Sequence, residues 1–171
     1  MRKKFMKVAA AAMALTMLST ITVFAQGWGQ VGSKWFYYYE DGTAARNTWI
    51  ETESGTYWMN SNGEMAADQW VNAEDSWYYM DGEGLFLSSQ LFEKDNKLYY
   101  FGEDGKMVSS QWVTAEDGKM YYFQENGAAV RNGWKMIDGD YYYFLKSGAV
   151  ATDALVPGGY RVGSDGKWIQ N

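Results

Sequence analysis

The side chains most able to do chemistry in this sequence are aromatic, with 9 Trp, 14 Tyr and 8 Phe among its 171 residues. Aromatic rings carry a negative face, so they attract cations and also pack against apolar surfaces. Neither property makes or breaks a covalent bond. The sequence contains no His and no Cys, which removes the commonest general base, the thiolate nucleophile and the commonest metal ligands. The chemistry that remains is mainly recognition.

Carboxylate pairs are the one remaining route to hydrolysis. The candidates are the neighbouring acids Glu51 with Glu53 and Glu74 with Asp75. We expect both pairs in hairpin turns, where acidic side chains are ordinary, and no nucleophile and base come together around them. The sequence therefore predicts a protein that is not an enzyme and that has no cofactor and no metal site.

The aromatic residues recur with a period of about 21 residues. Numbering each copy from its lead residue as offset zero places aromatic residues around offsets seven to ten, a glycine at offset 14 and an apolar residue at offset 16. The fifth copy has one extra residue, and we name its positions by their equivalents in the other copies. The seventh copy is short and degenerate, as a terminal copy of a solenoid often is. The lead residues are Trp28, Trp49, Trp70, Leu91, Trp112, Trp134 and Leu155.

Each copy has the residues of a β-hairpin. The lead Trp begins a short strand, pairs such as Asp95-Asn96 and Asp138-Gly139 suit a tight turn with positive φ, and the aromatic run suits the return strand. The glycine at offset 14 marks a second turn. One hairpin of this size is not stable alone in water. We therefore expect an all-β solenoid of stacked β-hairpins, with six regular hairpins and a terminal remnant.

Strand alternation divides the aromatic run between two faces of each hairpin. Offsets eight and ten are large and apolar in every regular copy, and we expect them in the core. Offset nine, on the other face, is also aromatic in every regular copy. Offset seven varies, from Trp35 and Trp77 to Thr56 and Leu98. A position that is Trp in one copy and Thr in another does not fill a fixed hole in the core, so it favours a ligand-facing role in some copies.

These repeats resemble the cell-wall-binding repeats of Gram-positive bacteria, a group that includes choline-binding and glucan-binding repeats. Stretches such as 70–81 and 132–148 carry the resemblance, which covers essentially all of the chain after residue 25. In choline-binding members, the resemblance implies that a quaternary ammonium group sits between consecutive hairpins, held by two aromatic residues of one copy and one of the next. The sequence departs from the pattern because the glycine before the lead Trp is present only at Gly27 and Gly133, and two copies begin with Leu.

Carrying this arrangement over, with offset nine as the residue from the next copy, predicts two complete cages. They are Trp28, Trp35 and Trp58, and Trp70, Trp77 and Tyr100. Two further groups are half-built, because Thr56 and Met120 occupy offset seven. They are Trp49 with Tyr79, and Trp112 with Tyr143. The junction from Leu91 and Leu98 to Tyr122 is not expected to bind a cation.

The expected ligand is a cell-wall polymer, either a choline-bearing teichoic acid or a glucan. A quaternary ammonium group has no N–H to donate, so aromatic faces recognise it, at about 0.5–2 kcal/mol for each contact. Single sites are then weak, and affinity comes from several sites on one polymer. Glucan is the alternative because Trp and Tyr also stack on sugar rings, and Gln69, Asn72 and Gln111 could bind hydroxyls. A third hypothesis is a structural or adhesive protein in which the tryptophans only pack hairpin against hairpin.

Residues 1–25 have the pattern of a secretory signal peptide, with four basic residues, an apolar run of about 16 residues that is short for a membrane span, and Ala25 before the cleavage site. Residues 26–171 then form one repeat domain. They contain 11 basic and 21 acidic residues, a net charge of −10, which argues against nucleic acid as a partner. We expect a secreted protein at the cell surface or cell wall, with no membrane span after signal cleavage.

Overall fold

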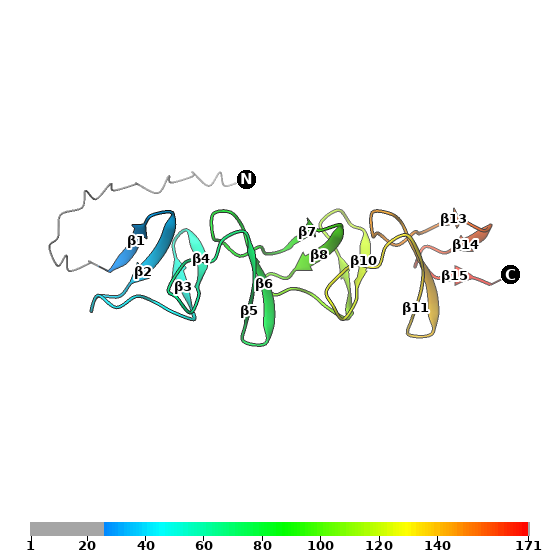
Figure 1. The fold of residues 1–171 in the computed structure, drawn as a ribbon. Helices are drawn as coiled ribbons and strands as arrows, with labels where there is room; N and C mark the ends of the chain where they lie inside the picture. The colour runs from blue at the N-terminus through cyan, green and yellow to red at the C-terminus, as the bar shows by residue number, and fades with distance from the viewer. Residues whose placement is uncertain (1–25, 171) are drawn as a thin grey trace, which may run out of the picture.

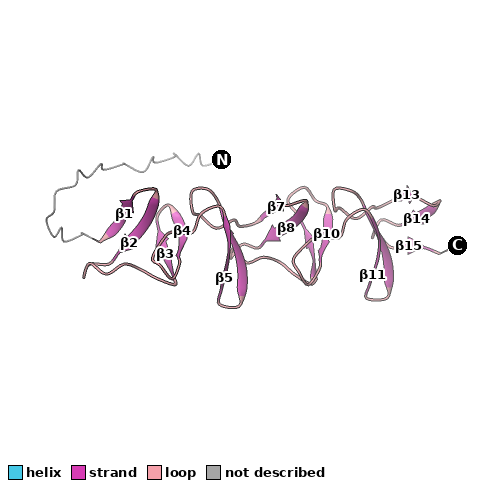
Figure 2. Ribbon diagram, in the orientation of Figure 1, coloured by secondary structure: helices cyan, strands magenta, loops and turns pink. Residues whose placement is uncertain are grey.

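The structure is a computed structural model that describes residues 26–170, so the predicted signal peptide lies outside the described residues. Within this range the chain is all β, with hairpins following one another along an elongated rod from β1 at one end to β15 at the other (Figure 1). Only strands, turns and loops occur in this part of the chain (Figure 2). It accordingly contains no helix that could cross a membrane. The predicted solenoid of stacked hairpins is confirmed.

Six antiparallel hairpins are followed by a three-stranded terminal sheet. The hairpins are β1 (Gly27–Val31) with β2 (Lys34–Tyr38), β3 (Thr48–Thr52) with β4 (Gly55–Met59), β5 (Gln69–Ala73) with β6 (Ser76–Met80), β7 (Gln90–Lys94) with β8 (Lys97–Phe101), β9 (Gln111–Thr114) with β10 (Met120–Phe123), and β11 (Gly133–Ile137) with β12 (Asp140–Phe144). The terminal sheet is β13 (Ala154–Val156), β14 (Tyr160–Val162) and β15 (Trp168–Ile169).

Most of the hairpin turns use residues with positive φ. Asp138 and Gly139 have φ of 53° and 90°, as the sequence predicts. Glu74 and Asp75 have φ of 52° and 59°, so this acidic pair lies in a turn. Two successive positive φ values match the right-handed twist of the strands that they join. The prediction for the other acidic pair is half right, because Glu51 lies within β3 and only Glu53 is in the turn.

A second left-handed position lies two residues before each lead residue from the second copy onward. Asn, Asp or Ser occupies it every time, and its amide donates to a carbonyl just after the return strand, as Asp68 does to Asp81 at 2.8 Å. The full set is Asn47, Asp68, Ser89, Ser110, Asn132 and Asp153, with φ between 45° and 55°. Short polar side chains tolerate this conformation. The turn therefore does not depend on a glycine directly before the lead residue.

Stacking joins each hairpin to the next through backbone and side chains. The amide of Met107 donates to the carbonyl of Trp77 in the preceding copy at 2.7 Å, and Val150 donates to Met120 at 2.8 Å. The side chains at offset ten are fully buried from the second copy onward, which confirms their prediction as core. They are Met59, Met80, Phe101, Phe123 and Phe144. Offset eight is buried at Tyr78 and Tyr121 and half-buried in the other regular copies.

The glycine at offset 14 is held against the preceding copy. Gly127 has φ of +76°, and a Cβ there would lie 2.3 Å from the Sδ of Met107. Gly118, in the hairpin turn of the same copy, has the same φ of +76°, but no atom lies within 4 Å of its Cβ position. The two glycines therefore share one backbone constraint and differ in the steric one.

We expect Gly118→Ala to destabilise the protein by about 1 kcal/mol through positive φ alone. Gly127→Ala should cost clearly more, by about 2 kcal/mol or above, because the new Cβ also displaces Met107. Urea unfolding followed by Trp fluorescence measures both. In a Met107→Ala background, Gly127→Ala should cost less stability than in the native protein, because the side chain that the new Cβ would displace is gone. Equal losses of stability for Gly118→Ala and Gly127→Ala would contradict the steric argument.

Candidate functional site

Each regular hairpin has a front face and a back face, which the strand register defines. In the third copy the lead Trp70 lies directly opposite Tyr79 at offset nine, and Asn72 lies opposite Trp77 at offset seven. These four side chains point to one side, the front. Offsets eight and ten point to the other side, the back. The lead residue and offset seven of one hairpin therefore share a face, as two members of a cage must.

The front of one hairpin packs against the back of the next. Trp70 meets Tyr79 of its own hairpin at 5.3 Å between ring centroids and Tyr99, at offset eight of the next hairpin, at 4.8 Å. The same contact recurs at the other Trp-led junctions between regular hairpins. The pairs are Trp28 with Tyr57 at 4.8 Å, Trp49 with Tyr78 at 4.7 Å and Trp112 with Tyr142 at 4.8 Å.

The aromatic residue that meets each lead Trp from the next copy is therefore at offset eight, and the predicted groups with offset nine are corrected. Each offset-nine ring instead contacts its own hairpin or the hairpin that follows it. Trp58 lies 4.9 Å from Trp49, Tyr79 lies 5.3 Å from Trp70, Tyr100 lies 6.1 Å from Phe123, and Tyr143 lies 5.3 Å from Trp134. The reason is geometric. Because the hairpins stack in one direction, the front of one meets the back of the next. A lead Trp therefore contacts offset eight of the next copy, which lies on the back face, and not offset nine, which lies on the front.

The junction between the third and fourth copies brings three aromatic rings together around Trp70. Trp77 lies 6.4 Å from Trp70 with the ring planes at 84°, and Tyr99 lies 4.8 Å from Trp70 with the ring planes at 70°. Trp77 is 47% exposed, so one wall of this group faces solvent. Burial raises the pKa of Tyr99, with a smaller contribution from Asp95. Its phenol therefore stays protonated at neutral pH, and the three rings form an uncharged aromatic corner.

Tyr79 has a different environment, although it touches the same Trp70. Its hydroxyl donates to Asp68 at 2.5 Å and accepts from the Lys94 ammonium at 2.7 Å, and that ammonium lies 5.1 Å from the ring centroid. The hydrogen bond from Tyr79 and then the contact with Lys94 lower the pKa of Asp68. Tyr79 is 2% exposed. Its ring already has a cation of the same chain beside it, so we assign it a packing role.

The junction between the sixth hairpin and the terminal sheet holds a second aromatic group, which surrounds a cavity of about 290 Å³. It is lined by Trp134, Tyr141, Tyr160 and Trp168. Trp168 lies 6.3 Å from Trp134 and 6.2 Å from Tyr141, and Tyr160 stands at 90° to Trp168 with centroids 5.7 Å apart. The lining is mostly apolar.

Sequence reasoning missed this group. Trp134 and Tyr141 occupy offsets zero and seven of the sixth copy, as Trp70 and Trp77 do in the third, so the repeat pattern already marked these two residues. It did not mark Tyr160 and Trp168, because the degenerate last copy does not follow the offset numbering. Tyr160 comes from β14 and Trp168 from β15, a strand pair that the other copies lack.

The remaining junctions are less complete. At the first, Trp28 contacts Tyr57, and Trp35 lies on the same face as Trp28. The second and fifth have Thr56 and Met120 at offset seven, as the sequence shows. At the fourth, Leu98 is 6% exposed and packs with Tyr121 and Phe123. That junction is closed by side chains of the protein itself.

An ion pair also spans the closed junction. The guanidinium of Arg131 donates to both carboxylate oxygens of Glu93 at 3.1 Å and to the carbonyl of Asn96 at 3.4 Å. The hydrogen bonds from Arg131 lower the pKa of Glu93. Across residues 26–170 there is no cluster of three or more acidic side chains that could hold a metal ion.

The repeats match known families along the described chain. One family model described as choline-binding repeat matches residues 43–86 and 128–168, and a second model with the same description matches residues 93–134. A third, described as putative cell wall binding repeat, matches residues 26–44. No curated protein matches the chain.

Solved structures show the same architecture. Choline binding protein F from Streptococcus pneumoniae is 31% identical with a TM-score of 0.68, over 85% of this chain and 48% of that protein. This chain thus spans about half of that relative's length. The choline-binding domain of CbpL from Streptococcus pneumoniae is 23% identical with a TM-score of 0.57, over 86% of this chain and 99% of that chain. Alternansucrase from Leuconostoc mesenteroides is 24% identical with a TM-score of 0.58, over 66% of this chain and 11% of that enzyme. The sequence matches and the shared fold agree, and this chain belongs to the choline-binding repeat family.

Proposed function

We propose that this chain is a secreted, non-catalytic protein that binds choline-bearing teichoic acid at the cell surface through aromatic cages between its hairpins. The observation that carries the proposal is the exposure of aromatic rings at two junctions. Trp77, Tyr141 and Tyr160 are 47%, 43% and 46% exposed, and each belongs to an aromatic group that contains a lead Trp. Clustered exposed aromatic residues in a soluble protein are typical of a binding surface.

The chemistry of these groups suits a quaternary ammonium ion. Trp70, Trp77 and Tyr99 present ring faces and edges rather than charged groups, and methylated cations gain from both the ring quadrupole and apolar contact. The cavity around Trp134 and Trp168 is small and mostly apolar, so it could hold one compact cation. The net charge of −10 on residues 26–171 would attract such cations over a longer range.

The family supports the same ligand class. Choline binding protein F has also been solved in complex with ipratropium, at 30% identity to this chain. Ipratropium carries a quaternary ammonium group, as choline does. We assign cation sites to Trp70, Trp77 and Tyr99, to Trp134, Tyr141, Tyr160 and Trp168, and to Trp28, Trp35 and Tyr57.

A polymer could occupy more than one of these sites at once. The β5–β6 and β11–β12 hairpins, which carry the lead residues of the two best-formed groups, point to the same side of the rod (Figure 1). They are three copies apart, and hairpin faces stack about 10 Å apart, so the sites would be roughly 30 Å apart. Linking weak sites through one ligand raises the overall affinity without any new contact.

Glucan binding is the alternative for the same aromatic rings. An alternansucrase whose repeats are 25% identical to this chain has been solved in complex with isomaltotriose. Tryptophan faces stack on sugars as well as on cations, but the cavity around Trp134 is mostly apolar, and Trp70 meets Trp77 and Tyr99 through ring contacts. We therefore place the cation first at these junctions.

Choline should bind the protein weakly and change its Trp fluorescence. Trp77→Ala removes one wall of one cage, so it should weaken that site by about 0.5–2 kcal/mol, a factor of roughly 2 to 30 in Kd. Tyr99→Leu should act on the same site, because it removes the ring that faces Trp70. Fluorescence and calorimetric titration with millimolar choline measures both.

The matched control is Thr56→Ala, which changes offset seven in a copy where that position is not aromatic. It should leave choline binding unchanged. Saturation by a soluble glucan without any response to choline would refute the cation assignment. If Thr56→Ala also lost binding, substitution at offset seven would act without removing an aromatic ring, and the effect of Trp77→Ala would be on folding and not on a cage.

The affinity for choline should be constant between pH 8 and pH 5. Tryptophan does not titrate, and burial raises the pKa of Tyr99 further above its usual value near 10. A cation held by a carboxylate would instead be lost as the pH falls through about 4. Titrations at pH 8, 5 and 4 on folded protein separate the two modes, and a fall in affinity confined to acid pH would contradict an aromatic cage.

On intact cells, we expect the protein in the wall fraction and its release by a wash with choline. A salt wash of equal ionic strength should release less, because a cage depends on ring contacts that salt screens little. Immunoblotting of the washes measures the release. Recovery from the culture medium alone would instead indicate a freely secreted role.

A further inference from the structure

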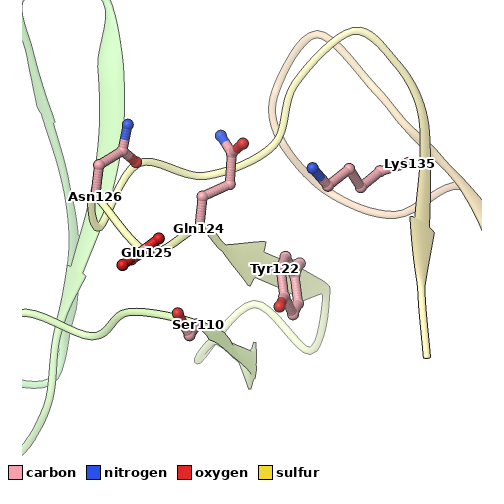
Figure 3. Close-up of a pocket in the computed structure, with 6 residues that line it drawn as sticks. All are labelled: Ser110, Tyr122, Gln124, Glu125, Asn126 and Lys135. Atoms are coloured by element: carbon pink, nitrogen blue, oxygen red, sulfur yellow. The ribbon is translucent and has the colours of Figure 1, made fainter.

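A second type of pocket opens between the fifth and sixth copies, with a volume of about 520 Å³. It is lined by Ser110, Tyr122, Gln124, Glu125, Asn126 and Lys135. Figure 3 shows Lys135 reaching from β11 toward Gln124, across the gap between the two copies. The volume falls within the range of about 300–1,000 Å³ that is typical of ligand sites. Five of its six lining side chains are polar, which sets it apart from the aromatic cages.

The pocket exists because Lys135 breaks a rule of the repeat. Offset one lies on the back face, and from the second copy onward it is apolar in every copy but this one. The other residues there are Ile50, Val71, Phe92, Val113 and Val156. Phe92 shows the effect of an apolar residue, since it lies 4.4 Å from Tyr79 at offset nine of the preceding hairpin. Lys135 is exposed and leaves the equivalent ring, Tyr122, half-buried at the pocket wall.

The polar groups around the pocket keep free hydrogen-bonding capacity. Asn126 accepts from the amide of Ala128 through Oδ1 at 3.0 Å, which leaves its amide N–H groups available. Gln124 donates to the carbonyl of Ala128 at 3.4 Å, which leaves its carbonyl oxygen available. Lys135 makes no ion pair with any residue from 26 to 170. Donors and acceptors are therefore mixed around one aromatic ring.

We propose that this pocket binds a pyranose unit of a cell-envelope glycan. The apolar C–H face of the sugar would lie against Tyr122, its hydroxyls would pair with Gln124, Asn126 and Ser110, and Lys135 would donate to a hydroxyl or acetamido oxygen. The ammonium of Lys135 disfavours a quaternary cation here, and the carboxylate of Glu125 disfavours a phosphate. This site goes beyond the proposed choline binding, because both the ligand class and the residues differ.

The test is an NMR titration of the protein with two soluble probes, isomaltotriose and the trimer of N-acetylglucosamine, each up to about 20 mM. We expect at least one of them to shift the amide signals of residues 110, 122, 124–126 and 135. The probe that binds identifies the sugar as a neutral glucan or an N-acetylated one. Lys135→Val places in this copy the residue that copies three, five and seven already have, so it should fold and should weaken binding at least tenfold.

Lys97→Val is the matched control, because it removes one exposed strand lysine from another hairpin. It should leave the sugar-induced shifts unchanged. Silence of the pocket residues with both probes, or equal binding by Lys135→Val, would overturn the proposal, as would shifts confined to Trp70 and Trp134. Choline titrated into the same samples should shift the cage residues in both variants. That result separates failure of the sugar site from failure of the cation sites.

Discussion

The contact on which this molecule depends is the packing of each lead tryptophan between an aromatic ring of its own hairpin and a ring of the next. Trp70 lies 5.3 Å from Tyr79 and 4.8 Å from Tyr99, at steep angles to both. A single hairpin of ten or so residues is not stable in water. The stack is stable because every hairpin offers a front to one neighbour and a back to the other. Folding and the proposed ligand binding therefore use the same surface.

In the function that we propose, whether a junction binds a ligand or only packs depends on offset seven. Leu98 is short enough for the next hairpin to cover, so it is 6% exposed and the fourth junction is closed. Trp77 is not covered by the next hairpin and stays 47% exposed beside Trp70. The same backbone thus gives a core in one place and an open aromatic corner in another. Each proposed binding site is thus a packing contact in which the neighbouring hairpin leaves part of an aromatic ring exposed.

The sequence was sufficient to predict the hairpins, the turns and the buried positions at offset ten, because period and parity are local properties. It could not show which face of one hairpin meets which face of the next, so it placed Tyr100 where the structure places Tyr99. That choice depends on the direction of stacking. The terminal group was hidden for a different reason. Trp168 reaches Trp134 through a third strand, which no regular copy contains.

Solenoid architecture also explains how one chain can carry junctions of different kinds. Each hairpin exchanges support only with its nearest neighbours, so a change at one junction leaves the others nearly unaffected. Lys135 in place of an apolar residue opens a polar pocket beside Tyr122, while Ile137 and Phe144 of the same hairpin remain buried. The departures from the repeat are thus confined to single junctions.

The missing glycines before the lead residues are a departure of another kind, because Asp68 and its equivalents already provide the left-handed turn one position earlier. Under these proposals, variation at offsets one and seven changes what a junction binds, whereas the left-handed residue and the buried side chain at offset ten maintain the rod itself.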